Sequence, residues 1–321
     1  MKTEELDWLA NLPRYTRRFG FFVGNRCRES NVDAVAEELG LDWEPVKNLD
    51  KLYMAEQLRI AGSPEPTVIG LDEIAVGKRH KYRIVVSDLL ARRPICFGGK
   101  DRSEASLDAF FTWLGPEKSS RIRLAVMDMW KAFRKSTLKP GHAPQARIIY
   151  YKFHIIGHLG KAMDLVRKRE YKRVAGDDRR YIKGKKYTLL TRWCNLNENG
   201  KEALRELFRI NRRLNTAYLL KESFGQLWHY VHPGWARRFF DRWRESLCDQ
   251  GLPSFEKFAM LVEAHWDGIE AYCHADNKVA FGFVEGLNNH IRAIQRQAYG
   301  FHDQEYFLLK ILTFMLPKLP I

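Results

Sequence analysis

The sequence has few cysteines and no long apolar run. Its five cysteines, Cys27, Cys96, Cys194, Cys248 and Cys273, stand alone, with no paired CxxC spacing. This pattern argues against a disulfide framework and against a zinc finger. No stretch approaches the roughly 18 consecutive apolar residues that a membrane-spanning helix needs. The N-terminal residues carry charge where a signal peptide would have an apolar core, so we expect a cytoplasmic protein.

Two further sequence patterns are missing. The chain has no glycine loop of the P-loop or dinucleotide-binding kind, so the sequence suggests no cofactor other than metal ions. His154 and His158 stand one helical turn apart, but no Glu follows His154 and no third ligand is evident. We therefore favour ordinary packing histidines over a zinc site.

Basic residues are abundant. Lys and Arg number 54 against 39 Asp and Glu, which gives a net charge of +15 over 321 residues. Such an excess favours a polyanionic partner, and we expect double-stranded DNA rather than a membrane surface. The length is enough for two or three domains, at roughly 150 residues for each.

Residues 1–62 predict a helical DNA-binding region. An apolar stripe over residues 32–39 stops at Gly40, and Asp42 is placed to cap a second helix. This pattern resembles a helix-turn-helix, in which early residues of the second helix face the bases. A plain helical hairpin is the alternative. The residues nominated for DNA contact here are Arg14, Arg17 and Arg18 for phosphates, and Glu44, Lys47, Asn48 and Lys51 for the groove.

Short apolar segments after Pro64 and Pro66 indicate an α/β core. We expect strands at residues 67–76, 81–89, 93–99, 122–128 and 146–151, and helices at 103–115 and 129–138. This order is that of a ribonuclease-H-like mixed sheet. The expected domains are the N-terminal region 1–62, the first part of the core 63–157, a large, mostly helical insertion 158–277, and the core's C-terminal helices 278–321.

Three acids stand where a two-metal phosphoryl-transfer site would need them. Asp72 and Asp128 lie at the ends of two apolar strands, and Glu285 opens a helix. Mg²⁺ and Mn²⁺ prefer carboxylate oxygens, and two such ions stabilise both the attacking and the leaving oxygen of a phosphodiester. The alternative is that each acid, considered by itself, is an ordinary turn or helix-cap residue.

Two further segments carry charge in a pattern. Residues 161–186 hold eleven Lys and Arg against four acids, with tyrosines between them, and we nominate Lys183, Lys185 and Lys186 for DNA contact. A solvated helical face is the alternative. The helix near Glu285 has an apolar face made of Val284, Leu287, Ile291, Ile294 and Ala298. Its polar stripe consists of Glu285, Asn289, Arg292 and Arg296, expected near the active site.

The segments GLDEIAVGKRHKY, MDMWKAF, FHIIGHLGKAMDLVRKREY and GFVEGLNNHIRAIQRQAYGFHDQEYFLLKIL, in this order, resemble the ISL-three family of insertion-sequence transposases. The resemblance implies a DDE transposase that cuts bacterial element ends, at their terminal inverted repeats, and joins them to target DNA. It places the catalytic, metal-binding acids at Asp72, Asp128 and Glu285 and implies two Mg²⁺ or Mn²⁺ ions. We also expect a homodimer on DNA.

The sequence departs from the family pattern in two places. Family members usually begin with a cysteine-rich zinc-binding module, whereas this sequence starts with the helix-turn-helix region. At the end of the fifth strand the family has Asp, a basic residue, Phe and His, whereas this chain has Tyr151, Lys152, Phe153 and His154. Tyr151 and His154 are therefore expected near the active site. A transposase-derived DNA-binding protein with weakened or no catalysis is the alternative function.

Overall fold

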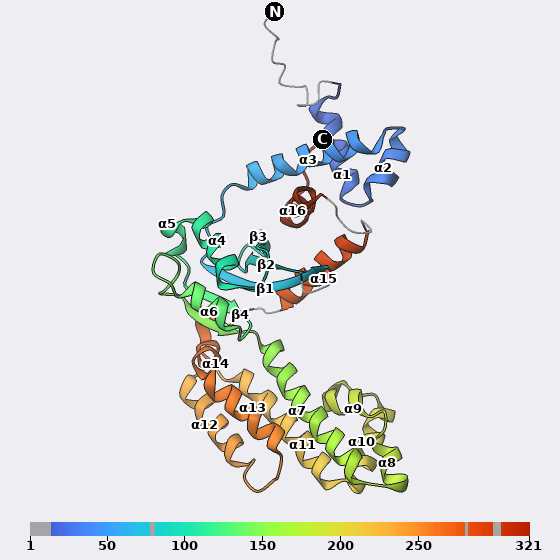
Figure 1. Ribbon diagram of the computed structural model, residues 1–321, viewed down its shortest axis with the longest axis vertical. Coiled ribbons are helices and arrows are strands. Elements are labelled where there is room, and N and C mark those ends of the chain that lie inside the picture. Colours follow the sequence, from blue (N-terminus) through green and yellow to red (C-terminus); the bar gives the residue numbers. More distant parts are fainter. Residues whose placement is uncertain (1–13, 78–80, 280–281, 298–302) are drawn as a thin grey trace, which may run out of the picture. The chain divides into compact units, whose positions relative to one another are not determined.

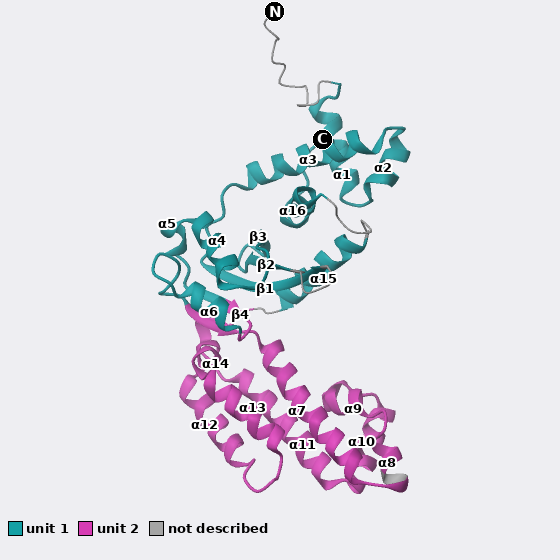
Figure 2. Ribbon diagram, viewed as in Figure 1, with its two compact units in different colours: residues 1–125, 130–146, 280–321 teal, residues 126–129, 147–279 magenta. Residues whose placement is uncertain are grey.

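A computed structural model describes residues 14–77, 81–279, 282–297 and 303–321 (Figure 1). The expected helical character of residues 1–13 and the position of Ala298 lie outside these residues. The chain divides into two compact units, shown in Figure 2. Unit 1 comprises residues 1–125, 130–146 and 280–321, and unit 2 comprises 126–129 and 147–279.

Five strands form one sheet in the order β3-β2-β1-β4-β5. The strands are β1 (Val68–Gly77), β2 (Lys81–Asp88), β3 (Arg93–Gly98), β4 (Leu124–Met127) and β5 (Arg147–Tyr150). Strands β1 and β2 pair antiparallel, as do β2 and β3. All four residues of β4 are buried, as the nearly continuous apolar run predicts for a strand covered on both faces. The expected strands and the mixed α/β class are confirmed.

Helices make up most of the remaining described residues. They are α1 (Arg17–Cys27), α2 (Val32–Leu39), α3 (Trp43–Ala61), α4 (Glu104–Leu114), α5 (Pro116–Ser119), α6 (Lys131–Thr137), α7 (Lys152–Arg173), α8 (Gly176–Ile182), α9 (Lys186–Leu190), α10 (Glu198–Ile210), α11 (Arg212–Phe224), α12 (Pro233–Glu245), α13 (Pro253–Ala264), α14 (Trp266–Tyr272), α15 (Gly282–Gln297) and α16 (Gln304–Thr313). Three short 3-10 helices are η1 (Trp193–Asn195), η2 (Gly225–His229) and η3 (Ala275–Asn277).

The turn between α2 and α3 follows the sequence signals with one exception. Gly40 ends α2 in the left-handed conformation, with φ of 62°, which glycine adopts without steric cost. Asp42 occupies the N-cap position of α3, but its side chain makes no capping hydrogen bond, so the expected cap is wrong in that detail. Asp42 is exposed, and water satisfies an exposed carboxylate about as well as a helix N–H does. The short helix α5 was not expected.

The core of unit 1 joins the two ends of the chain. Tyr306 of α16 and Leu319 pack into the cluster formed by α1, α2 and α3. Buried Asp50 of α3 accepts a hydrogen bond from Tyr306 Oη at 2.5 Å. The same carboxylate forms an ion pair with Lys310 Nζ at 2.6 Å. The Tyr53 hydroxyl accepts the N–H of Leu319 at 3.0 Å. The N-terminal helices are thus held by the C-terminal segment.

One face of the sheet in unit 1 is covered by α15 and α16. Ile74, Val85 and Phe97 of the first three strands form a buried cluster with residues of these two helices. The helix residues in the cluster are Leu287, Ile291, Phe307 and Ile311. The apolar face expected for the helix that carries Glu285 therefore packs on the sheet.

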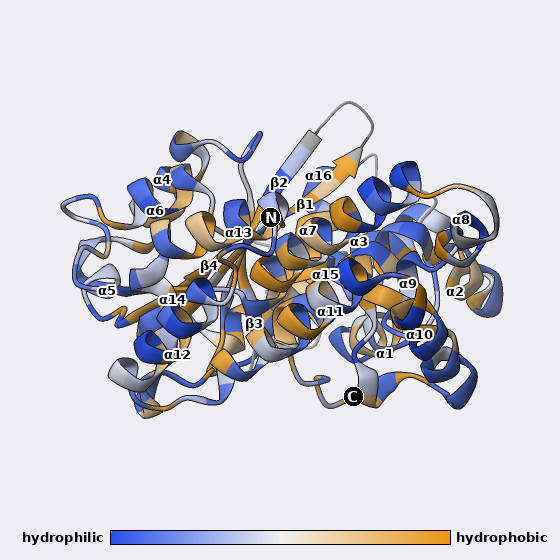
Figure 3. Cartoon of the chain, turned by 90° about the horizontal axis from the view of Figure 1, so that it is seen from below, coloured by the Kyte–Doolittle hydropathy of each residue, from blue (hydrophilic) through white to orange (hydrophobic). Residues whose placement is uncertain are grey.

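Unit 2 builds its core around the long helix α7, which contacts α11 and α13. Aromatic rings fill the centre: Phe224 lies 4.9 Å from both Trp243 and Phe258, measured between ring centroids. The described residues between β5 and α15 lie in helices and in the turns between them. Helix α10 carries both hydrophilic and hydrophobic residues (Figure 3), and its Leu204 and Leu207 are buried.

Helix α14 packs against β5 at a position that only glycine fills. A Cβ at Gly268 would lie 2.4 Å from the Tyr150 ring, closer than any real contact. We predict that Gly268→Ala destabilises the protein by about 1–3 kcal/mol, as overpacking does. Gly157→Ala is the control, because an added Cβ there would meet no described atom within 4 Å apart from its chain neighbours and the nearby backbone of α7. Urea unfolding should show a loss for Gly268→Ala and none for Gly157→Ala; equal stability of both variants would contradict the packing argument.

Candidate active site and basic surfaces

Asp72 is held on strand β1 by hydrogen bonds to both carboxylate oxygens. It pairs in register with Val85 of β2. Its Oδ1 accepts the backbone N–H of Glu73 at 2.8 Å, and its Oδ2 accepts the Asn288 side-chain amide at 2.5 Å. The neighbouring Glu73 instead faces Arg102, whose Nη1 lies 3.4 Å from Glu73 Oε1. Alternation along the strand thus gives the two acids different partners.

Asp128 follows the buried strand β4, which neighbours β1 in the sheet order. Its Oδ1 accepts the backbone N–H of Met129 at 2.6 Å and lies 3.7 Å from His154 Nδ1. The pKa of the next histidine along α7, His158, is lowered by burial and then by the charge of Lys161.

Tyr151 lies between β5 and α7. Its backbone N–H donates to the Met127 carbonyl at 3.0 Å, and its side chain is almost fully buried. The residue occupies the N-cap position of α7, where its side chain makes no capping bond. Its ring centroid lies 5.9 Å from that of His154. The structure thus brings Tyr151, His154 and the end of β4 together within unit 2.

The polar stripe of α15 is exposed. Glu285, Asn289, Arg292 and Arg296 all face solvent, and Arg292 Nη1 donates to Asn289 Oδ1 at 3.2 Å. Sequence reasoning passed over Asn288, which is the asparagine that contacts Asp72. The signal was available, because Asn288 follows Leu287 and precedes Ile291 on the side of the helix that packs on the sheet. A polar residue there needs a buried partner.

The acids offer donors that suit a hard cation. Asp72, Asp128 and Glu285 supply carboxylate oxygens, the ligands that Mg²⁺ and Mn²⁺ prefer. In the part of the chain that the structure describes, no three His, Cys, Asp or Glu side chains form a group that could hold a metal ion. Asp72 and Asp128 thus each have their own hydrogen-bonding partners in the structure. Their carboxylate oxygens are of the kind that divalent ions bind.

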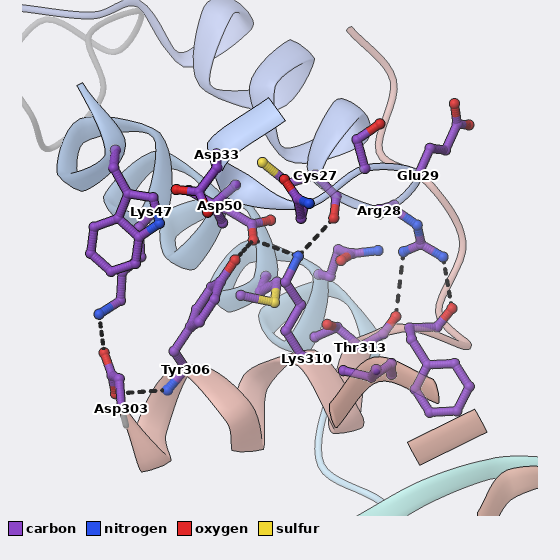
Figure 4. A pocket seen from close by; sticks show the side chains of 18 of the residues that line it. Cys27, Arg28, Glu29, Asp33, Lys47, Asp50, Asp303, Tyr306, Lys310 and Thr313 are labelled. Carbon is purple, nitrogen blue, oxygen red and sulfur yellow. Dashed lines mark hydrogen bonds and ion pairs between the residues drawn. The ribbon is translucent and has the colours of Figure 1, made fainter. Parts of the chain in front are cut away.

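The nominated lysines of α3, Lys47 and Lys51, pair with acids at the start of α16, and Figure 4 shows the contact of Lys47 with Asp303. Lys47 Nζ lies 2.6 Å from Asp303 Oδ2, and Lys51 Nζ lies 2.9 Å from the same oxygen. Lys51 also lies 2.8 Å from Glu305 Oε2. These contacts, with the backbone N–H of Tyr306, hold the pKa of Asp303 well below its ordinary value. Asp303 therefore stays ionised and partly neutralises both lysines.

The other nominated residues of the N-terminal region differ in exposure. Arg14, Arg17 and Arg18 are exposed, and Arg17 Nη2 lies 3.5 Å from Glu56. Asn48 is half-buried on α3. A pocket of about 520 Å³ lies beside Lys47, between the N-terminal helices and α15 and α16. None of the three acids Asp72, Asp128 and Glu285 lines it.

A second basic surface covers α7, α8 and α9 in unit 2. Lys183 and Lys186 are exposed, and Lys185 is half-buried. Tyr187 is 74% exposed, with Lys186 Nζ 5.4 Å from its ring centroid. Exposed rings beside cations suit stacking on bases and contact with phosphates.

Within the described part of the chain, every helix is too short or too polar to span a membrane.

Comparison with known proteins defines the class. Residues 69–311 match the profile of a DDE transposase family, ISL3 (ISL-three), described as transposase. The chain is 34% identical over 313 residues to the transposase for insertion sequence element IS1001 of Bordetella parapertussis, covering 97% of this chain and 76% of that relative. It is 26% identical over 335 residues to the transposase for insertion sequence element IS1557 of Mycobacterium tuberculosis, covering 96% and 74%.

The protein is therefore a transposase, an enzyme that processes DNA. More narrowly, the chain belongs to the ISL3 family of DDE transposases, and membership of this family implies divalent metal ions.

Proposed function

We propose that this transposase cleaves DNA at the terminal inverted repeats of an insertion sequence and joins the ends to target DNA. The observation that carries the proposal is the position of two family acids, Asp72 on β1 and Asp128 after β4, on strands adjacent in the sheet. In this reading residues 63–157 and 278–321 form a ribonuclease-H-like core. Residues 158–277 are its insertion, and residues 1–62 are the helix-turn-helix region.

We assign the metal ligands to Asp72, Asp128 and Glu285. Two divalent ions, when bound, stabilise the charge of the attacking and leaving oxygens. The chain's own residues supply the rest: the backbone N–H groups of Glu73 and Met129 fix one oxygen of each aspartate. His154 Nδ1 lies 3.7 Å from Asp128 Oδ1, so its ring neighbours that carboxylate without a direct hydrogen bond. The exposed Arg292 and Arg296 extend from Glu285 along α15 and would bind a phosphate strand.

DNA binding would use the basic residues of the N-terminal region and the basic surface of α7 to α9. The protein would act as a homodimer. The exposed arginines of residues 14–18 and the lysines of α7 to α9 provide phosphate contacts. A second candidate function is a DNA-binding protein with weakened catalysis. Tyr151 favours it, because a buried phenol stands where the family resemblance implies an aspartate.

The assignment of Asp128 predicts a separation of cleavage from binding. Asp128→Asn keeps the size of the side chain but removes the charge that a divalent ion needs. Strand cleavage of DNA that carries the true element ends should fall below detection, while DNA affinity should change less than twofold. Asp249→Asn is the control, since Asp249 is exposed at φ 62°, a conformation that asparagine tolerates. Cleavage by Asp128→Asn at the wild-type rate would contradict the assignment.

The ion pairs of α3 predict opposite effects of two substitutions on DNA affinity. If Lys47 and Lys51 contact DNA, Lys47→Ala should weaken binding and Asp303→Asn should strengthen it, because Asp303 competes with phosphate for both lysines. Log affinity should fall with log salt at a slope of roughly −0.9 per neutralised phosphate.

Fluorescence anisotropy at several salt concentrations measures both effects. Lys135→Ala is the control, because Lys135 is an exposed lysine that pairs with Glu104 and is not among the residues proposed to contact DNA. Weaker binding by Asp303→Asn, or no salt dependence, would show that α3 does not bind DNA through these lysines.

Tyr151 predicts a gain of function. Tyr151→Asp places a carboxylate at the N-cap of α7, where it can accept helix N–H bonds, close to the end of β4. Mn²⁺ affinity and strand cleavage should rise by about 10- to 100-fold if the aspartate orients His154 or adds charge near the ions. Tyr151→Asn separates the two effects, since it caps the helix without a charge. Unchanged metal affinity in a folded Tyr151→Asp variant would show that position 151 has no role in the active site.

A further inference from the structure

Asn288 is a buried amide on the packing face of α15. It is 7% exposed, while its neighbours on that face, Leu287 and Ile291, are 1% and 0% exposed. A polar group in such a place lowers stability unless it is hydrogen-bonded, so an apolar residue would serve packing better. The presence of an amide there indicates a role that packing alone does not supply.

The hydrogen bonding of this amide is directional. Asn288 Nδ2 lies 2.5 Å from Asp72 Oδ2. An ionised carboxylate only accepts hydrogen bonds, so the amide must face it with its N–H group, which settles the orientation of the amide. Asn288 Oδ1 consequently points elsewhere. It is buried and accepts no hydrogen bond from any described residue.

The bond also fixes the position of Glu285. Asn288 and Glu285 stand three residues apart on α15, so they are neighbours along the helix surface. Tying Asn288 to Asp72 therefore sets the height of α15 along β1, together with the bond from Gln295 Nε2 to the Val76 carbonyl at 2.8 Å. A one-residue shift of the helix would break both bonds and move Glu285 by about 1.5 Å along the axis.

We propose that Asn288 is a positioning residue for the metal site, a role that rests on the proposed function of Asp72 and Glu285. Its N–H group holds Asp72 Oδ2 in one orientation, and the carboxylate held in this way would offer its oxygens to a divalent ion. Asn288 touches neither DNA nor the reacting atoms. Its contribution is to the affinity and placement of the ion.

A double-mutant cycle on Mn²⁺ binding tests this role, with the intact protein and electron paramagnetic resonance as the readout. The variants are Asn288→Ala, Asp72→Asn and the two combined. Asn288→Ala should weaken Mn²⁺ binding by about 10- to 100-fold, as loss of a ligand's supporting hydrogen bond does. In the Asp72→Asn background it should have little further effect, because the carboxylate it positions is gone.

Asn211→Ala is the matched control for lost stability. Asn211 is 6% exposed, and its Nδ2 donates to the buried Glu170 carboxylate at 3.0 Å in unit 2. That variant should lower the unfolding midpoint and leave Mn²⁺ affinity unchanged. Asn288→Ser, which keeps a donor in a smaller side chain, provides a second variant should Asn288→Ala fold poorly, and it should retain part of the affinity.

The outcomes separate this inference from the proposed function. If Asp72→Asn weakens Mn²⁺ binding and Asn288→Ala does not, the inference is wrong and the proposed metal site stands. Equal loss from Asn288→Ala with and without the Asp72 carboxylate would show that it acts through helix packing, which also overturns the inference. If neither substitution changes Mn²⁺ affinity, the proposed site itself is wrong, and the role of Asn288 falls with it.

Discussion

The packing of α15 on the sheet is the constraint on which the proposed active site depends. Leu287 and Ile291 enter the cluster formed by Ile74, Val85 and Phe97, and this contact decides which side of α15 faces β1. The helical repeat then leaves Glu285 exposed and turns Asn288 toward Asp72. Glu285, the proposed third acid, is thus positioned by apolar residues beside it, and the polar contact of Asn288 to Asp72 refines the result of that packing.

A second constraint acts at the other end of unit 1. Asp50 is fully buried, and a carboxylate in that position requires partners that offset its desolvation. Lys310 and Tyr306 of α16 provide them, and burial together with Asp50 raises the pKa of Tyr306. This network holds α16 against α3, which brings Asp303 to Lys47 and Lys51. The same helix therefore links the docking of the N-terminal helices to the proposed role of Lys47 and Lys51 on DNA, because phosphates would have to compete with Asp303.

Local sequence signals predicted the secondary structure well, for reasons visible in particular residues. Strand β4 is a continuous apolar run and is buried throughout, and Gly40 and Gly115 end helices where predicted. The side-chain contacts were less predictable, because they join residues far apart in the sequence. Nothing near Lys47 indicates that Asp303 would meet it, and the choice of Asn289 over Asn288 followed a polar stripe without knowing which side of α15 faces Asp72. Asp42 shows a smaller limit, since water competes for an exposed cap.

The central claim is that Asp72, Asp128 and Glu285 hold divalent ions on which strand cleavage depends. The most direct measurement is anomalous X-ray diffraction from crystals of the protein bound to DNA carrying the element ends and soaked in Mn²⁺. The account predicts anomalous peaks within about 2.0–2.6 Å of carboxylate oxygens of all three residues, the range of hard-cation bonds to oxygen. Mn²⁺ peaks bound by other residues, with these three carboxylates free of metal, would contradict it.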